Sequence, residues 1–388
     1  MEIETLEQLD RVLDSGRPLA GLRLQGLDLA SRAERLIGRD ATGLVVLGGT
    51  TTAELERWLS HHGALVFPMV TDCPVDPYRA RLYRPEELYA GLENGYAATP
   101  DAMAYAWHGD RLAKEDILAT LLRAVHDDSV NDALGELLAG LPVVGVMGGH
   151  ALPRGSAGYA DAARLARELA RVGLVVITGG GPGAMEAANL GAHLAVADDD
   201  VLEEALDRLA AVPSFVPDVA AWARVGLEVR ATLPVPERLS SVSVPTWFYG
   251  HEPPNVFSDH IAKYFSNALR EDTLLARCTA GVVYLPGAAG TVQEIFQAAT
   301  SGYYSASGGV PLVLVGRRHW EETLPVWPLL QALGEERQLA HRVHLVDGSD
   351  EPEGAGFAEV VTDILTTSSR PHQGGEQSPD GRVSRRRP

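Results

Sequence analysis

Short apolar runs alternate along this chain with longer segments in which apolar residues recur at helical spacing. From Leu141 onward the alternation is regular and predicts a strand at residues 142–147, a helix at 159–172, a strand at 174–178 and a helix that opens near Gly183. A strand-helix-strand-helix unit of this kind predicts a parallel sheet. Glycines follow both predicted strands, at the edge where open α/β sheets bind ligands.

Three more apolar runs lie further along, at residues 281–285, 311–315 and 343–346. Each is continuous and rich in β-branched residues, as expected of strands that helices cover on both faces. The sequence therefore predicts the α/β class, with a doubly wound, Rossmann-like parallel sheet.

The chain divides into three predicted parts. Residues 1–135 read as an N-terminal α/β region of unknown role, with strands at 43–47 and 64–70 and helices at 52–61 and 113–125. Residues 136–366 form the predicted Rossmann-like domain. Residues 367–388 are Ser, Gly, Pro, Gln and Arg without periodicity, so we expect a disordered tail.

Composition narrows the function classes. A length of 388 residues suggests two cores, and a net charge of −19 argues against binding to a nucleic-acid backbone. No apolar run reaches about 18 residues and the N-terminus is acidic, so we expect a cytoplasmic protein without a membrane partner. Cys73 and Cys278 lie far apart without a Cys/His cluster, which gives no reason to expect a disulfide or a metal site.

Two glycine-rich turns follow the first two strands of the predicted Rossmann-like domain. Gly148 and Gly149 allow close approach of a ligand, or merely form a tight turn. The run Gly179–Gly180–Gly181–Pro182–Gly183 opens the next helix, whose N-terminus is suited to an anion or hydroxyl group. It is not the dinucleotide fingerprint, which would place GxGxxG after the first strand and an acidic residue at the end of the second, so NAD is disfavoured and no cofactor is expected.

The third turn carries the most chemistry. Its residues Gly287, Ala288, Ala289, Gly290 and Thr291 lie between a buried strand and a helix, where backbone N–H groups, the threonine hydroxyl and the helix dipole can bind a 5′-phosphate. Glu294 follows one turn into that helix. Its carboxylate either faces a ribose or is a plain partner of the helix dipole.

These turns resemble those of the LOG-type phosphoribohydrolases, once labelled lysine decarboxylases, and more closely the pyrimidine/purine nucleotide 5′-monophosphate nucleosidases. The resemblance covers about residues 142–320. Residues 181–187 match GPGAMEA, residues 252–255 match EPPN, and the third turn matches PGGxGTxxE. Two departures stand out: Ala288 replaces a glycine of the third motif, and the family's arginine falls by spacing on Glu271, next to Arg270.

The resemblance implies hydrolysis of the N-glycosidic bond of a nucleoside 5′-monophosphate to a free base and ribose 5-phosphate, by a dimer or larger homo-oligomer. Glu294 is the candidate that stabilises the oxocarbenium-like state or orients water. Arg270 would hold the phosphate or steady the leaving base, while Gly148, Gly149, Gly180, Gly181 and Gly183 would line the substrate pocket. Glu186 either takes a ribose hydroxyl or caps its helix.

Two other functions are alternatives to nucleotide hydrolysis. Decarboxylation with pyridoxal phosphate needs a lysine, and the two lysines, Lys114 and Lys263, border no glycine-rich turn. A nucleotide-binding or sensing module without turnover fits the Ala288 change and the displaced arginine. The sequence gives neither the base preference nor any allosteric regulator.

Overall fold

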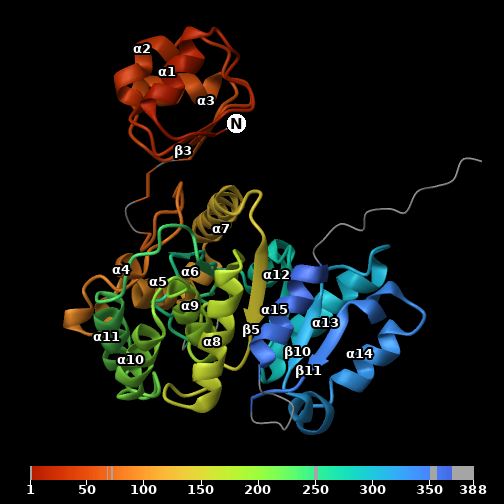
Figure 1. Cartoon of the computed structure of the whole chain (residues 1–388). Coiled ribbons are helices and arrows are strands. Elements are labelled where there is room, and N and C mark those ends of the chain that lie inside the picture. The colour runs from red at the N-terminus through yellow and green to blue at the C-terminus, as the bar shows by residue number, and fades with distance from the viewer. Residues whose placement is uncertain (1, 68, 71–72, 249–251, 350–355, 369–388) are drawn as a thin grey trace, which may run out of the picture.

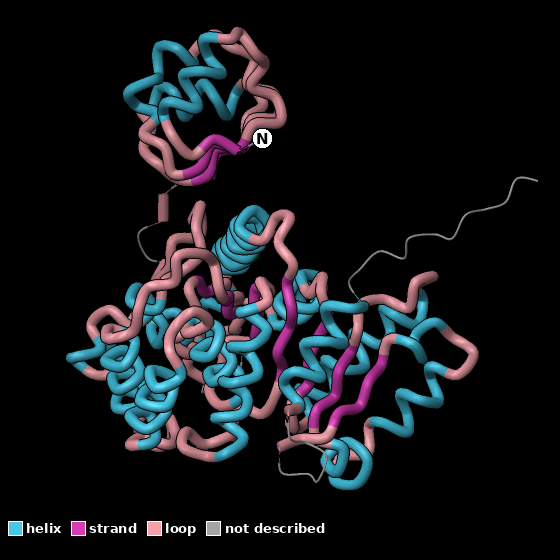
Figure 2. Tube along the Cα trace, in the orientation of Figure 1, coloured by secondary structure: helices cyan, strands magenta, loops and turns pink. Residues whose placement is uncertain are grey.

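The computed structural model describes residues 2–67, 69–70, 73–248, 252–349 and 356–368 of the chain. It contains two parallel sheets, each with its own hydrophobic core (Figure 1). The N-terminal unit forms a separate body beside the larger one (Figure 2).

The N-terminal sheet has four strands in the order β1-β2-β3-β4, all parallel. Its elements are β1 (Glu2–Ile3), α1 (Leu6–Asp14), β2 (Arg23–Gln25), η1 (Leu29–Arg32), α2 (Ala33–Leu36), β3 (Val45–Leu47), α3 (Ala53–His61) and β4 (Leu65–Phe67). Successive strands begin about 21 residues apart, so the chain returns to the sheet at nearly regular intervals, as in repeat architectures. The helices cover one face of the sheet and bury Leu9, Leu55 and Leu59 against strand residues such as Leu24 and Val46.

The larger sheet has seven parallel strands in the order β11-β10-β9-β5-β6-β7-β8. These are β5 (Val143–Met147), β6 (Val175–Thr178), β7 (Ser241–Ser243), β8 (His260–Ile261), β9 (Gly281–Tyr284), β10 (Leu312–Val315) and β11 (Val343–Val346). The strand order runs outward from β5 in both directions, so the direction of winding reverses between β5 and β9. The predicted doubly wound parallel sheet is confirmed.

Helices cover both faces of this sheet. On one face lie α8 (Ala157–Arg171), α9 (Ala184–His193), α10 (Asp199–Ala210), α11 (Val219–Arg230) and α15 (Phe357–Ser368). The other core includes side chains of α5 (Pro100–Gly109), α7 (Ile117–Leu137), α12 (Asn267–Arg277), α13 (Ala289–Tyr304) and α14 (Trp327–Gly334). Along β5, Val144 and Val146 point to the first core and Val143 and Met147 to the second, the alternation that a strand imposes.

Short helices make up most of the remaining regular structure. They are α4 (Pro85–Leu88), η2 (Leu92–Asn94), η3 (Tyr96–Ala98), α6 (Arg111–Glu115), η4 (His319–Thr323) and η5 (Gln338–His341). The helix predicted at residues 113–125 is divided into α6 and α7, because Asp116 ends the first and caps the second by accepting the amide of Leu118 at 3.0 Å. Side chains between residues 75 and 134, among them Val75, Leu88 and Leu134, belong to the core of the seven-stranded sheet, although the sequence grouped them with the N-terminal region.

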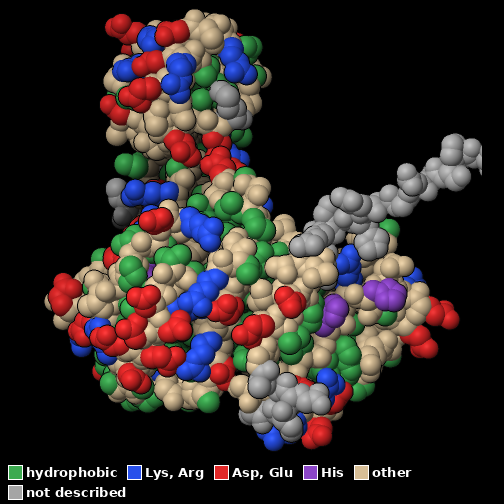
Figure 3. Space-filling model, in the orientation of Figure 1, with side chains coloured by type: hydrophobic (Ala, Val, Ile, Leu, Met, Phe, Trp, Pro, Cys, Tyr) green, Lys and Arg blue, Asp and Glu red, His purple; other side chains and the backbone are tan. Residues whose placement is uncertain are grey.

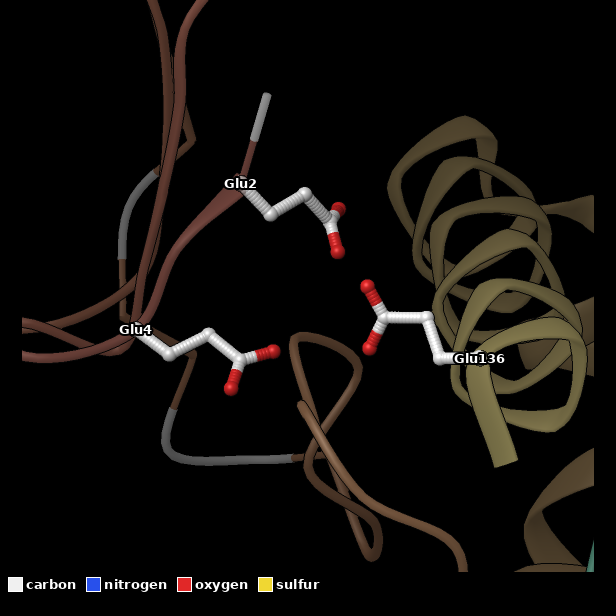
Figure 4. A group of neighbouring side chains, drawn as sticks. All are labelled: Glu2, Glu4 and Glu136. Atoms are coloured by element: carbon white, nitrogen blue, oxygen red, sulfur yellow. The ribbon is translucent and has the colours of Figure 1, made fainter. Parts of the chain in front are cut away.

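The two units meet at β1, β2 and α7. Arg23 donates to Glu2 at 2.7 Å and to Asp132 at 2.9 Å, and Gln25 donates to the carbonyl of Tyr78 at 3.0 Å. Beside these contacts, Glu2 and Glu4 face Glu136 on α7 (Figure 4). Leu47 of β3 also packs with Tyr78 and Leu122 of the larger unit, so the contact surface combines charged and apolar side chains.

The disordered tail was predicted for residues 367–388, and residues 369–388 lie outside the described part. Residues 367 and 368 are the end of α15, a helix that the sequence analysis did not anticipate. No helix among the described residues is both long and apolar enough to cross a membrane. Acidic and basic side chains are interspersed over the face of the larger unit seen in Figure 3.

Candidate functional site

The three glycine-rich turns lie side by side at the carboxyl edge of the larger sheet. They follow β9, β5 and β6, which are neighbours in that order. The amide of Gly149 donates to the carbonyl of Pro286 at 3.1 Å, and the amide of Ala184 donates to the carbonyl of Gly149 at 3.1 Å. The first turn thus ties the other two together at the point where the winding of the sheet reverses, the usual ligand position in such folds.

The third turn presents an uncapped helix N-terminus. Helix α13 begins at Ala289 without a side-chain hydrogen bond from its N-cap residue, Ala288, and the first amide bonded back to the turn is that of Val292, 3.0 Å from the carbonyl of Ala288. Residues 288–290 are exposed. The amides at positions 289–291 precede that bond and can receive an anion.

Two features fix the shape of this turn. A Cβ atom at Gly287 would overlap the side chain of Thr291, so only glycine allows this packing. His319 lies with its Nε2 atom 3.0 Å from the carbonyl oxygen of Gly287. Ala288 has a φ of −121°, a value that alanine adopts without strain, so the departure from the family's glycine leaves the turn intact.

Glu294 lies one turn into α13 and is largely buried, with 13% of its side chain exposed. Burial raises the pKa of its carboxyl to about 7, the guanidinium of Arg270 lowers it, and the nearby carboxylates of Glu271 and Glu252 add to the rise. A carboxyl with a pKa near neutrality can accept or release a proton at physiological pH.

Arg270 approaches Glu294 from α12, and its Nη1 atom lies 3.4 Å from Oε1 of Glu294. Nη2 donates to Oδ1 of Asn267 at 2.8 Å, and the Nε atom is buried and makes no hydrogen bond within the described structure. The guanidinium also borders Gly179 of the second turn. The neighbouring Glu271 accepts from Gln293 at 2.5 Å and from Nη2 of Arg270 at 3.5 Å, and neither of these hydrogen bonds involves Glu294. Arg270, and not Glu271, is therefore the residue that contacts Glu294.

The second turn is held from behind by a buried polar network. Asn255 donates its backbone amide to the carbonyl of Gly180 at 2.8 Å and its side-chain amide to the carbonyl of Gly181 at 3.2 Å. Asn189 on α9 accepts from Asn255 at 2.9 Å and from Thr178 at 2.8 Å. The asparagine of the EPPN stretch thus fixes the carbonyls of the turn, so the opposite side of the turn is left for a ligand.

Gly183 brings the second turn against the first. It has a φ of +70°, and a Cβ atom there would overlap the carbonyl of Gly149. Both the backbone conformation and the close approach require glycine at this position.

Glu186 lies in the first turn of α9, directly after the second turn. Its side chain is fully buried and forms a bidentate ion pair with Arg154, with N–O distances of 2.5 and 3.0 Å. Arg154 also donates to the carbonyl of Trp222 at 3.1 Å. The carboxylate of Glu186 is therefore engaged by an internal cation.

Two side chains near the turns were not anticipated from the sequence as site residues. Glu252 extends toward Gly181, and its Oε1 atom lies 3.2 Å from Nδ1 of His150, the residue that follows the first turn. Glu252 begins the EPPN stretch, and His150 directly follows Gly149. Their place in two motifs was a usable signal, but the loop that carries Glu252 has no periodicity from which its position could be inferred.

Two further features, a cavity and a cluster of three carboxylates, lie outside the glycine-rich turns. A cavity of about 800 Å³ lies at the amino ends of β7 and β8, but its lining combines the cations Arg84, Arg230 and Arg238 with the acids Glu86, Glu237 and Asp259, so it favours neither charge. Among the described residues, Glu2, Glu4 and Glu136 could share a metal ion, since one oxygen of each lies within 4.8 Å of the others (Figure 4). This group lies between the two units, away from the turns.

Comparisons with known proteins support the domain type. Residues 141–197, which include the first two turns, match the SLOG cluster4 family. The chain is similar there to proteins of the SLOG/LOG-like Rossmann superfamily, a coarser relationship than the nucleosidase resemblance. No curated protein matches the chain.

Solved structures with a similar arrangement include two molybdenum cofactor proteins. The binding protein from Rippkaea orientalis is 16% identical, with a TM-score of 0.35 over 58% of this chain and 99% of that one. The carrier protein from Chlamydomonas reinhardtii is 17% identical, with a TM-score of 0.34 over 58% and 99%. The protein TM1055 is 17% identical, with a TM-score of 0.31 over 56% and 98%.

Proposed function

We propose that this protein hydrolyses the N-glycosidic bond of a nucleoside 5′-monophosphate and releases a free base and ribose 5-phosphate. The observation that carries the proposal is Glu294, a buried carboxyl with a pKa of about 7 that contacts Arg270 and lies one turn from an uncapped helix N-terminus. A phosphate site beside a neutral-pH carboxyl is the combination that this reaction requires. The match of residues 141–197 to SLOG cluster4 supports a nucleotide-related role.

The substrate would lie across the carboxyl edge of the sheet. Its 5′-phosphate would accept hydrogen bonds from the backbone amides of residues 289–291 and from the hydroxyl of Thr291. The helix dipole also favours an anion at this position. The ribose would lie between that turn and the Arg270–Glu294 pair. The base would extend along Gly180–Gly183, with Gly148 and Gly149 beneath the ribose.

Cleavage then follows from the position of Glu294. As the bond from C1′ to the base nitrogen breaks, its electron pair leaves with the base and positive charge grows on the ribose ring. The carboxylate of Glu294 stabilises that charge, and it takes a proton from the water whose oxygen attacks C1′. Arg270 keeps part of the carboxyl population ionised, because its charge lowers the pKa that burial raises.

A panel of nucleoside 5′-monophosphates tests the proposal. The purified protein is incubated with AMP, GMP, IMP, CMP and UMP, and free base and ribose 5-phosphate are followed by chromatography. Release of both products in equal amounts, abolished in Glu294→Gln, is the expected result. Tight nucleotide binding by calorimetry without any release of base would instead favour a sensing module without turnover.

A further inference from the structure

We infer that His150, oriented by Glu252, delivers the proton to the leaving base; this assignment rests on the proposed nucleosidase function. The two residues come from different motifs, yet Nδ1 of His150 lies 3.2 Å from Oε1 of Glu252. A carboxylate this close to Nδ1 favours an orientation of the imidazole that keeps Nδ1 toward Glu252, and the second ring nitrogen, Nε2, is then left for a substrate.

The pair lies at the base end of the site. Arg270 borders Gly179 at the start of the second turn, while the carboxylate of Glu252 lies beside Gly181, two residues further along. The ribose is assigned to Arg270 and Glu294, so a base that continues along the second turn reaches Glu252 and His150. The charge of Glu252 also contributes to the raised pKa of the Glu294 carboxyl.

The proposed reaction needs a second proton-transfer group. Glu294 can receive the proton from water, but the electron pair of the broken bond remains on the base, and an unprotonated purine or pyrimidine is a poor leaving group. His150 in its charged form donates a proton to the base as the bond breaks and becomes neutral. With 47% of its side chain exposed, it regains a proton from solvent before the next turnover. Water supplies the hydroxyl at C1′, so atoms and charge balance.

A comparison of substrates that differ only in the leaving base tests this role. In 7-methylguanosine 5′-monophosphate the base already carries a positive charge and leaves without protonation, whereas the base of GMP needs a proton. For a wild type that accepts only pyrimidines, 5-fluorouridine 5′-monophosphate and UMP form the corresponding pair of better and poorer leaving groups. The variants are His150→Gln and Glu252→Gln, with His341→Gln as the control on the exposed residue at the end of η5.

His150→Gln should lower kcat for the poorer leaving base about a hundredfold or more, and should change kcat for the better one much less. Glu252→Gln should show the same selectivity with a smaller effect, and His341→Gln should match the wild type. An equal fall for both substrates in His150→Gln, with an unchanged thermal melt, would overturn the assignment while leaving the proposed function standing. A wild type that releases no base from any nucleotide would overturn the proposed function and this assignment with it.

Discussion

The guanidinium of Arg270 and the carboxylate of Glu294 meet at a distance of 3.4 Å, although 24 residues and strand β9 separate them in the chain. Arg270 comes from α12 and Glu294 from α13, the helices before and after that strand. The continuous unit α12–β9–α13 therefore brings together a buried acid, its cation and an uncapped helix N-terminus.

Removal of the arginine should shift the pH dependence of turnover. The charge of Arg270 lowers the pKa of Glu294, so in Arg270→Gln that pKa should rise above about 7. The ionised carboxylate is the active form, and the rising limb of kcat/KM against pH should accordingly move to higher pH. Arg164→Gln, which alters an exposed arginine paired with Glu203, is the control and should leave the profile in place. An unchanged limb in Arg270→Gln would show that the guanidinium does not influence the acid.

The third turn, the proposed phosphate site, should tolerate no side chain at Gly287. A Cβ atom there overlaps Thr291, so Gly287→Ala should displace the turn and raise KM for a nucleoside monophosphate about tenfold or more. Rates with the nucleoside that lacks phosphate, which we expect to be far lower in the wild type, should change little. Gly109→Ala, at the end of α5 where a Cβ atom meets nothing within 4 Å, is the matched control. A wild type with equal rates for nucleoside and nucleotide would argue against any phosphate site.

The regular part of this fold was predictable because its strands are continuous, mostly apolar runs of four or five residues. The β5, β6, β9, β10 and β11 runs and the turns after them follow directly from the sequence. Strands β7 and β8 do not, because Ser241–Ser243 and His260–Ile261 are only three and two residues long and include polar side chains. Their pairing is set by neighbouring strands, which a local pattern cannot show.

In the candidate site, too, some features could be predicted from the sequence and others could not. The glycine-rich turns could be predicted from the sequence because positions such as Gly183 and Gly287 have no room for a Cβ atom and therefore require glycine. The contact of Arg270 with Glu294 and that of Glu252 with His150 depend on how separate elements pack, and spacing alone even pointed to Glu271 in place of Arg270. Glu186 stood in a matching motif, but its buried partner Arg154 lies 32 residues away.

The Glu186–Arg154 pair should contribute to stability. Both side chains are buried, so Glu186→Gln leaves the charge of Arg154 without a counter-ion and should cost roughly 3 to 5 kcal/mol of the free energy of unfolding. The exposed pair of Arg164 and Glu203 provides the control, where Glu203→Gln should cost at most about 1 kcal/mol. Urea unfolding measures both. A stable Glu186→Gln variant with lost turnover would instead assign Glu186 to the ribose.

The contact between the two units should weaken as the pH rises. Burial and the neighbouring Asp132 raise the pKa of Glu2 to about 7, against the opposing effect of Arg23. A pKa raised above the ordinary 4.5 means that the stabilising contribution is present at low pH and is lost as the pH rises through about 7. Glu2→Gln removes this loss, so it should protect the N-terminal unit from proteolysis at pH 8 and have little effect at pH 5. Equal protection at both pH values would show that the titration of Glu2 is not involved.

Glu294→Gln should change turnover and stability in opposite directions. If the carboxylate stabilises the oxocarbenium-like state, its loss should lower kcat about a hundredfold or more while nucleotide binding survives. In the folded protein the carboxyl has a pKa of about 7, against 4.5 as its ordinary value, so its contribution to stability is lost as the pH rises through 7. Glutamine has no such titration, and at pH 8 the variant should therefore unfold at a higher temperature than the wild type. If Glu294 only complements the helix dipole, the variant should keep wild-type turnover and lose about 0.3 to 1 kcal/mol of stability. Steady-state kinetics and thermal melts of the same preparations at pH 6 and pH 8 separate the two roles.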